Sequence, residues 1–588
     1  MKKHYETHVE DTDKLISVAG PVLDYKSWYE QYRKLMEEQA QRKYGLYTPT
    51  SEGDEDDFPS IPGMIARYSA LGLTNEEMSK NPVWVDKTGN GHDLQMKNFA
   101  WGGMSGVGGY EMNFNLWTNN VPSIPDISMS TTTTSVSVSV GNSTYNNNLI
   151  YIHMNNWDIN KNHWLKVTST YEDGDLAFIF YNDKNTKKIE LPANGYANIP
   201  AYPEFKGSYM YISTTSNKQG SFTIEQLPLY PGALVFDGVD DYGTCNNFPI
   251  LTKEKGYTVV VLRQWDQDFL NTTLTGGLLS TRNYSTGEGV AFEKIESSNK
   301  GYWNLGAGGI IDFAKSPFTW QTSKQYNNVG ILKGDKNHGK PLCVGCGLSG
   351  GQQCGRFAIW ELVFLDHDAT EEELTKIKDY FVKTYPWLFP DQAWTVVGKT
   401  NEDEDRATIA NITGNGNDLV LSNFGFAEGS GYNEEGEYAG YLVTDGVDDK
   451  IISSIFKMGN DWTVIGDWEL INTGENDNAG IVKFDSIVIY NYNYNSMLIN
   501  IKNGRNILIP DQNTVNAICS DGRIYSKDWK ESIYNEETES TSKNFLTIGY
   551  SGNAYTKIAF KNLAIYPTVL SREDCIKAYN YLQTLKAK

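Results

Sequence analysis

Short runs of alternating apolar and polar residues, separated by turns rich in glycine and asparagine, cover most of the chain. The clearest run is STTTTSVSVSV at 130–140, whose strict alternation suits a half-buried strand. The runs NLIYIHM, LAFIFYND, GSYMYIST and GSFTIEQ continue this pattern as far as residue 226. The pattern predicts antiparallel strands joined by short turns, and it places a small β-sandwich at 112–231.

Apolar residues at helical spacing are found in few places. One amphipathic helix is predicted from Asp24 to Tyr44, and Gly45 can end it. Two more helices are predicted after Thr370 and Ser571, each an N-cap followed three positions later by an acidic residue. An acidic linker, SEGDEDDFPS, follows the first helix, so its aromatic stripe is expected either to dock on another subunit or to fold back on the chain. The stripe that we assign to assembly comprises Tyr25, Trp28, Tyr29, Tyr32, Leu35 and Met36.

Two motifs occur twice. TGNGHDL at 88–94 is repeated as TGNGNDL at 413–419, and LVFDGVDDYG at 234–243 is repeated as LVTDGVDDKI at 442–451. The two motifs begin much farther apart in the first copy, which therefore holds an insertion of about the size of a small domain. The predicted organisation is an arm and linker at 1–63, a first module at 64–111 plus 232–390, an inserted β-sandwich at 112–231 and a second module at 391–588.

Net charge and the distribution of apolar residues argue against some classes of function. The chain has 588 residues and a net charge of −22, which argues against binding the phosphates of nucleic acids. The sequence MKKHYETHVEDTDKL at the N-terminus has no apolar signal region, and no later stretch offers ~18 consecutive apolar residues. We therefore expect synthesis in a host cytoplasm without a signal peptide, and no insertion into a membrane.

The six cysteines are distributed unevenly between the copies, which argues against a disulfide framework. Cys343, Cys346 and Cys354, with His338 upstream, resemble a zinc site only loosely because no second CxxC pair is present. The alternative is a set of free thiols in a glycine-rich connection between strands.

Carboxylates and tryptophans supply the candidate binding residues. The two DGVDD motifs offer hard oxygens of the type that calcium takes, although an acidic turn before a strand needs aspartate and glycine for backbone reasons alone. Beyond such calcium, no cofactor is expected. Tryptophans in loops could stack on sugar rings, although in a β-sandwich they more often belong to the core. The candidates are Asp237, Asp240, Asp241, Asp445, Asp448 and Asp449 for calcium, and Trp101, Trp117, Trp303 and Trp320 for glycans.

The motifs WVDKTGNGHDL, LVFDGVDDYG and KGYTVVV, followed by a strand and a capped helix, resemble the concanavalin A-like lectin and glucanase superfamily in its laminin-G-like form. The second copy departs from the first at ATIANITGNGNDL, which lacks the tryptophan. The resemblance implies a mainly β chain with two jelly-roll β-sandwiches of concanavalin A-like type. A further β-sandwich is inserted in the first of them, and an N-terminal helical arm precedes them.

Tandem modules behind a helical arm are also similar to structural and fibre proteins of tailed bacteriophages, including crAss-like phages of gut Bacteroidota. This similarity implies a virion structural protein, namely a head fibre, tail fibre or decoration subunit. Such a subunit would be a homo-oligomer attached to other virion proteins through its arm, and it would display lectin-like sandwiches for attachment to a host surface glycan. A free carbohydrate-binding lectin and a polysaccharide hydrolase are the alternatives.

Glucanases on this scaffold carry an E-x-D-x-x-E strand, in which alternate carboxylates share one face of a sheet. This sequence has no such run. The nearest acidic strand spaces Glu361 and Asp366 five apart, which places them on opposite faces. We therefore predict that the chain is not an enzyme.

Overall fold

The computed structural model divides the chain into two compact units, Met1–Asp57 and Phe58–Lys588. The described residues run from 57 to 587, and the predicted helix at 24–44 with its assembly residues lies outside them. The gaps within this range are 113, 120–126, 142–151, 154–162, 182–185, 200–204, 206–208, 215–218, 250–256, 271, 282–290, 295–299, 304–309, 313–328, 333–341, 349–351, 428, 437, 457–458, 472–479, 485–486, 494–495, 502–504, 510–514, 527–528, 534–545 and 552–553.

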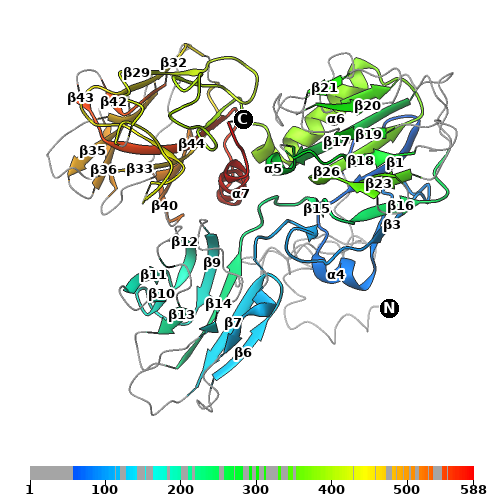
Figure 1. Cartoon of the computed structure of the whole chain (residues 1–588), viewed down its shortest axis with the longest axis horizontal. Coiled ribbons are helices and arrows are strands. Elements are labelled where there is room, and N and C mark those ends of the chain that lie inside the picture. The colour runs from blue at the N-terminus through cyan, green and yellow to red at the C-terminus, as the bar shows by residue number, and fades with distance from the viewer. Residues whose placement is uncertain are drawn as a thin grey trace, which may run out of the picture. The chain divides into compact units, whose positions relative to one another are not determined.

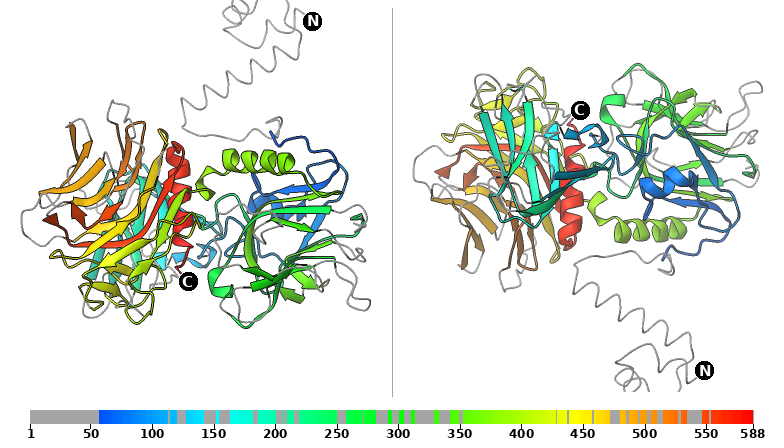
Figure 2. Two further views of the ribbon diagram at one scale, coloured as in Figure 1. Left: turned by 90° about the horizontal axis from the view of Figure 1, so that it is seen from above. Right: turned by 90° about the horizontal axis from the view of Figure 1, so that it is seen from below.

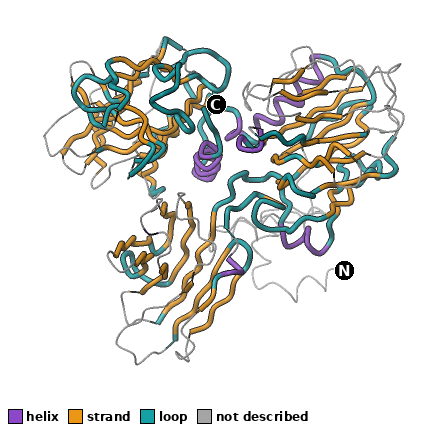
Figure 3. The backbone as a smooth tube through the Cα atoms, viewed as in Figure 1, coloured by secondary structure: helices purple, strands orange, loops and turns teal. Residues whose placement is uncertain are grey.

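The described chain is mainly β, as predicted, and helices are few (Figures 1 and 3). The described helices are α4 (Asn75–Lys80), α5 (Gln267–Leu270), α6 (Glu371–Thr384) and α7 (Arg572–Gln583), with 3-10 turns at Phe114–Leu116 and Pro386–Leu388. Among them, none combines the length and the apolar composition needed to cross a lipid bilayer.

The first repeat, by which we mean 64–111 and 232–390, forms two sheets. In the first sheet the strand order is β22-β17-β26-β15-β4, and β1 also pairs with β26. In the second sheet the order is β2-β3-β16-β23-β18-β19-β20-β21; β25 pairs with β18, and β24 pairs with β25. The first sheet comprises β1 (Met64–Ser69), β4 (Gly106–Val107), β15 (Leu234–Asp237), β17 (Tyr257–Trp265), β22 (Val329–Leu332) and β26 (Arg356–Leu365). The second comprises β2 (Val83–Trp84), β3 (Leu94–Lys97), β16 (Tyr242–Cys245), β18 (Gly276–Ser280), β19 (Ala291–Lys294), β20 (Lys300–Trp303), β21 (Ile310–Asp312), β23 (Leu342–Val344), β24 (Cys346–Leu348) and β25 (Gln352–Cys354).

The second repeat, 391–588, repeats this plan. Its sheets have the orders β30-β31-β44-β33-β38-β39-β40, with β27 paired to β44, and β28-β29-β32-β41-β34-β35-β36-β37. The first sheet comprises β27 (Gln392–Thr395), β30 (Gly431–Asn433), β31 (Tyr441–Val443), β33 (Thr463–Leu470), β38 (Val515–Cys519), β39 (Arg523–Ser526), β40 (Glu531–Ile533) and β44 (Ile558–Tyr566). The second comprises β28 (Thr408–Ile409), β29 (Leu419–Ser422), β32 (Lys450–Ser453), β34 (Gly480–Phe484), β35 (Ile487–Asn493), β36 (Ser496–Ile501), β37 (Arg505–Ile509) and β41 (Thr547–Ile548), beside the pair β42 (Tyr550–Ser551) and β43 (Ala554–Tyr555).

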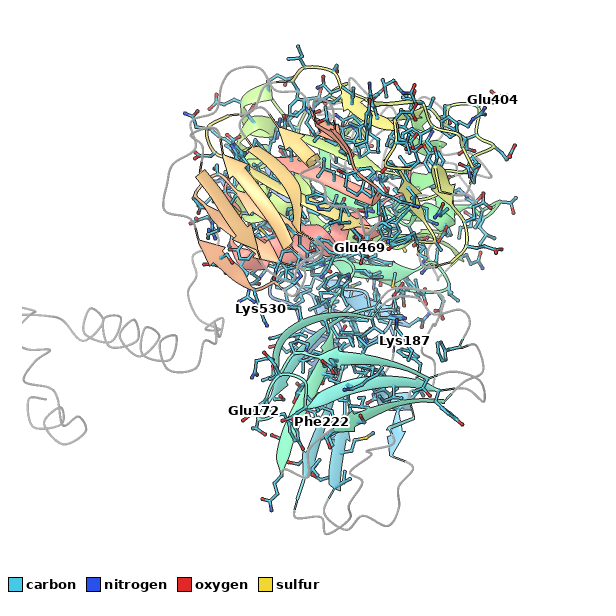
Figure 4. All side chains as sticks on the ribbon, turned by 90° about the vertical axis from the view of Figure 1, so that its left-hand side faces the viewer. Glu172, Lys187, Phe222, Glu404, Glu469 and Lys530 are labelled. Atoms are coloured by element: carbon cyan, nitrogen blue, oxygen red, sulfur yellow. A yellow bond between two sulfur atoms is a disulfide. The ribbon has the colours of Figure 1, made fainter. Side chains whose placement is uncertain are left out.

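The insertion, 112–231, has sheets of its own around a separate apolar core. Phe222, one of its core residues, is 2% exposed (Figure 4). One sheet comprises β6 (Ile127–Thr131), β7 (Ser135–Val140), β9 (His163–Ser169), β12 (Asn194–Ile199) and β14 (Gly220–Gln226). The other strands are β10 (Leu176–Tyr181), β11 (Thr186–Leu191) and β13 (Tyr209–Thr214), and the pair β5 (Thr118–Asn119) and β8 (Ile152–His153).

The central strand of each repeat is apolar on both faces because each face meets a different core. In β26, Phe357 and Ile359 point between the two sheets, whereas Ala358 and Trp360 belong to a second core with α6. In both repeats the register of the central pair shifts at a β-bulge, opposite Leu262 and Arg263 in the first. A bulge switches which residues face each side, and here Glu361 lies on the face where Tyr385 donates to its carboxylate at 2.8 Å. The helix α6 packs on that face (Figure 2).

The predicted N-caps of α6 and α7 are confirmed. Thr370 and Glu373 form a capping box, in which the Thr370 side chain accepts from the backbone of Glu373. Ser571 accepts from the backbone N–H of Asp574. Each cap satisfies backbone donors that a helix N-terminus would otherwise leave without a partner.

The cysteine predictions need correction. Cys346 and Cys354 form a disulfide that joins β24 to β25. Two of the three sulfur atoms considered for zinc are therefore bonded to each other, and His338 lies outside the described residues. A pair of adjacent strands brings these two cysteines together, which their spacing in the sequence did not reveal.

Candidate functional site

The acidic motif of the first repeat forms a tight turn between β15 and β16. The carboxylate of Asp237 accepts from the backbone N–H of Val239 at 2.7 Å, and that of Asp241 accepts from the N–H of Asp237 at 3.0 Å. Gly238 has φ +78°, and a Cβ there would lie 3.1 Å from the backbone nitrogen of Arg356. The turn therefore requires glycine at this position.

The second repeat builds the same turn. Asp445 accepts from the N–H of Val447 at 2.7 Å, and Asp449 accepts from the N–H of Asp445 at 2.7 Å. Gly446 has φ +77°. The middle of each turn presents an apolar side chain to solvent, since Val239 is 73% exposed and Val447 is 70% exposed.

Each turn is bonded to a loop that follows the other repeated motif in the chain. Ser105 Oγ donates to the second carboxylate oxygen of Asp241 at 2.9 Å and accepts from the N–H of Ala100 at 2.8 Å. Asn98 Nδ2 donates to the backbone oxygen of Asp240 at 3.1 Å. Ser430, Gly425, Asn423, Asp448 and Asp449 make the corresponding bonds in the second repeat. We call this unit the corner; it comprises residues 98–105 with 237–241, and 423–430 with 445–449.

Each corner holds an aromatic residue in the left-handed backbone region. Trp101 has φ +51° and stacks on Phe99 at 4.7 Å between ring centroids. Phe426 has φ +49°, and the guanidinium carbon of Arg406 lies 5.1 Å from its ring centroid. This conformation is uncommon and costs a residue with a bulky side chain about 1 kcal/mol or more. Both repeats nonetheless place an aromatic residue there.

Burial perturbs one carboxyl group in each corner. It raises the pKa of Asp241 to about 7, and the charges of Asp237 and Asp240 act in the same direction. Burial likewise raises the pKa of Asp449 to about 6. Hydrogen bonds donated by the turn and by the serine oppose these shifts without cancelling them.

The predicted calcium ligands do come together. In each turn the three aspartates can place one carboxylate oxygen apiece within 4.8 Å of one another. Such oxygens suit calcium. However, the first aspartate and the buried third aspartate of each motif already accept hydrogen bonds from the backbone of the turn, which explains their presence without a metal ion. Calcium binding therefore stays a prediction.

The tryptophan candidates do not form one site. Trp101 lies in the first corner, where it is partly buried against the core of the sandwich. Trp117 is 2% exposed and packs inside the insertion, which makes it a core residue. Trp303 ends β20, but its side chain is not described, and Trp320 lies outside the described residues.

Sequence reasoning missed two asparagines, one in each repeat, that hold the strand that follows the corner loop. Asn75 accepts from the N–H of Val107 at 2.7 Å and donates to its carbonyl at 3.1 Å. Asn401 makes both bonds to Tyr432, each at 2.8 Å. The signal was present in the sequence as TNEE at 74–77 and TNED at 400–403.

No protein-family model and no curated protein matches this chain. Among solved structures, it is similar to a Trypanosoma rangeli sialidase in complex with sialic acid (8% identity, TM-score 0.24, 79% of this chain and 85% of that one covered). It is also similar to the receptor-binding domain of botulinum neurotoxin type G (14%, 0.20, 32% and 50%). A third structure is domain 4 of AbnA, a GH43 extracellular arabinanase from Geobacillus stearothermophilus, in complex with arabinotriose (10%, 0.20, 32% and 100%).

At these identities and TM-scores the similarities carry no argument about what this chain does, and they give no link to a bacteriophage. The prediction that the chain is not an enzyme was wrong as an exclusion: sialidases are among the similar structures, and the missing glucanase motif concerns only one class of hydrolase. Glu361, one of the two carboxylates weighed there, is engaged in a buried ion pair with Arg67.

Proposed function

We propose that this chain is a carbohydrate-binding protein that recognises neutral glycans at its two corners. The observation that supports this most directly is that, in both repeats, a loop that carries an aromatic residue at positive φ is hydrogen-bonded to the turn that carries an exposed aspartate. A carboxylate can accept hydrogen bonds from sugar hydroxyls, and an aromatic ring can cover the apolar face of a sugar. Binding sites commonly combine apolar or aromatic surface with a few polar groups that fix orientation.

The negative charge of the chain and of its corners favours neutral glycans as ligands. The chain carries a net charge of −22, and each corner adds three aspartates within a few residues. An acidic polysaccharide would meet like charge at the corner, which costs binding energy. Neutral sugars avoid this cost, so they are the proposed ligands.

The test begins with a glycan array probed by the full-length chain, followed by calorimetry on the best ligand. Asp240→Asn and Asp448→Asn, made together, remove two exposed carboxylates without touching the buried partners of the turn. We expect affinity to fall at least tenfold. Glu404→Gln is the matched control because Glu404 is exposed and lies outside both corners (Figure 4). Binding that is unchanged in the double variant, or no binding of any neutral glycan, would refute the proposal. Analysis of the incubated ligand for cleavage products tests the hydrolase alternative in the same experiment.

We also propose the finer assignment, a virion structural protein attached through residues 1–63. Its support is the aromatic stripe in the sequence and the division of the chain after Asp57. Light scattering should compare the full chain with a truncation that begins at Asp57. This truncation keeps Phe58, whose ring lies 4.0 Å from the guanidinium carbon of Arg67. A defined oligomer that becomes monomeric on truncation would support assembly through the arm, whereas two monomers would exclude self-assembly by this route.

A further inference from the structure

The disulfide of the first repeat lies directly beneath the turn of the first corner. Cys346 Sγ is 3.5 Å from the backbone oxygen of Asp241, in a buried contact. The backbone just before Cys346 passes equally close, since a Cβ on Gly345 would lie 2.6 Å from the same oxygen. Tyr242, the residue after Asp241, packs against the cluster that contains the disulfide. The end of the turn is therefore supported by the sulfur atoms.

The strand on the other side of the disulfide reaches the start of the same turn. β25 ends at Cys354, and Arg356, two residues later, pairs with Asp237. A Cβ on Gly238 would lie 2.8 Å from the Cβ of Arg356, so the two backbones are in close contact. Since the disulfide joins β24 to β25, it holds together the two segments that support the turn.

The second repeat builds the same support without sulfur. In each repeat the glycine just before the first strand of this pair accepts from the N–H of the residue just after the second strand, at 3.0 Å. This bond aligns Cys346 with Tyr550 and Cys354 with Tyr555, and in both repeats the two residues are paired across the strands. The fold of a corner therefore does not require a disulfide, and the second corner has no bond at this place that a reductant could break.

One sulfur of the disulfide lies near the surface. Cys354 is 5% exposed, whereas Cys346 is 0% exposed, and the two residues before Cys354, Gln352 and Gln353, are exposed. Gln353 has φ +57°, a conformation that is uncommon for a residue with a side chain. Local opening of this short strand makes the Cys354 sulfur reachable by a small thiol.

We propose that the Cys346–Cys354 disulfide is a reversible redox switch that orders the first corner and leaves the second corner unchanged. Its effect on glycan binding depends on the function proposed above. Disulfides persist in oxidising compartments and are reduced in a cytoplasm. The switch therefore releases the first corner under reducing conditions, where the chain binds through one corner, and orders it under oxidising conditions, where the chain binds through both.

The reductant is a small thiol such as glutathione. Its thiolate attacks the Cys354 sulfur, so a mixed disulfide forms and Cys346 leaves as a thiolate that takes up a proton. A second glutathione thiolate attacks the glutathione sulfur of the mixed disulfide, which releases Cys354 and oxidised glutathione. Two glutathione thiols are oxidised and one protein disulfide is reduced to two thiols, so atoms and electrons balance. Cys343, in the same cluster, does not compete, because burial raises its pKa to about 12 and keeps its thiol protonated.

The test compares the oxidised and reduced forms of the full-length chain. Peptide maps made without reduction should show Cys346 linked to Cys354, and incubation with reduced glutathione should remove this link. Hydrogen exchange of the amides at 237–241 should then become about 10- to 100-fold faster, whereas the amides at 445–449 should not change. A Cys346→Ser Cys354→Ser variant should exchange fast throughout and should not respond to glutathione. Cys245→Ser, which removes a buried free thiol outside the cluster, should respond like the natural chain.

Calorimetry with a neutral glycan separates the switch from the proposed function. Asp448→Asn, which removes the exposed carboxylate of the second corner, should lose at least tenfold in affinity on reduction, whereas Asp240→Asn should bind equally well in both forms. If no neutral glycan binds either form, the proposed function fails, and hydrogen exchange alone supports or overturns the switch. Equal exchange at 237–241 in the two forms, or a link between the cysteines that does not form or cannot be reduced in the folded chain, would overturn the switch. Faster exchange with unchanged binding by the Asp448→Asn variant would overturn its control of glycan binding.

Discussion

Arg67 and Glu361 form a buried ion pair in the first repeat. Arg67 in β1 makes two contacts with Glu361 in β26, at 3.1 and 3.2 Å, and the two side chains are 3% and 0% exposed. Tyr385 donates to Glu361 at 2.8 Å, and Arg67 donates to Tyr380 at 2.9 Å. The perturbation is Glu361→Gln, which keeps the shape of the side chain and removes its charge.

The expected loss of stability comes from the charge of Arg67, which the substitution leaves buried. Glutamine leaves the guanidinium of Arg67 buried without a counter-charge, and breaking a buried pair in this way costs about 3 to 5 kcal/mol. Burial already raises the pKa of Glu361, against the opposing effect of Arg67, so water contributes little to stabilising either charge. Replacing both partners by apolar residues, Arg67→Met with Glu361→Leu, removes the uncompensated charge. We expect the double variant to recover more than half of the loss.

Hydrogen exchange of the amides in β26, residues 356–365, measures this loss locally. A cost of about 3 to 5 kcal/mol corresponds to exchange faster by about two to three and a half orders of magnitude. The control is Lys80→Ala, which removes the exposed pair with Glu76, whose side chains are 70% and 78% exposed; it should cost no more than about 0.5 kcal/mol. If Glu361→Gln behaves like this control, or if the double variant is no better than the single one, the account of the pair is wrong.

Three further predictions concern stability. Asp241 and Asp449 have folded pKa values of about 7 and about 6, above the ordinary 3.8, so the folded state binds protons more tightly; their contribution is fully present at low pH and is lost as pH rises through these values. The thermal midpoint measured from pH 8 to pH 5 should therefore increase by less in an Asp241→Asn Asp449→Asn variant than in the natural chain, and equal slopes would contradict this. Thr370→Ala removes the capping box and should lower the free energy of unfolding by about 1 kcal/mol in a denaturant titration. Thr375→Ala, on the exposed face of the same helix, is the control, and an equal loss in both variants would count against the role of the cap. Asn401→Ala should cost about 1 to 3 kcal/mol because two backbone groups lose their partner, and an unchanged unfolding midpoint would show that water replaces the amide.

The sequence predicted what depends on local pattern. The caps at Thr370 and Ser571 could be read because a capping residue and its partner lie three positions apart. The strand at 135–140 could be read because its valines alternate, and Val136, Val138 and Val140 are all buried. The repeated motifs likewise identified two stretches that fold in the same way.

Contacts over long separations could not be read in this manner. Ser105 and Asp241 are 136 positions apart, and Arg67 and Glu361 are 294 apart. Only the register of the sheets brings such residues together, and a β-bulge beside Glu361 changes which face it joins. Alternation alone would have assigned that residue to the wrong face, since a one-residue shift reverses every side chain.

Comparison of the two repeats separates what the fold requires from what it leaves open. Asp86 and Asn411 are corresponding residues of different charge, yet the Oδ1 atom of each accepts from the residue two positions later, Thr88 or Thr413, at 3.0 and 3.1 Å. The fold therefore needs an acceptor there and tolerates the loss of the negative charge.

In the corner, by contrast, both repeats keep a residue that the fold does not require. The second residue of the aspartate set is Asp240 in one copy and Asp448 in the other, and both carboxylates are exposed. In the described bonds the turn uses only the backbone of these two residues. The packing of the sandwich explains the buried Asp241 and Asp449 but places no demand on these exposed neighbours. Their identity in two copies that differ at Asp86 and Asn411 is what makes them the decisive residues in the glycan experiment.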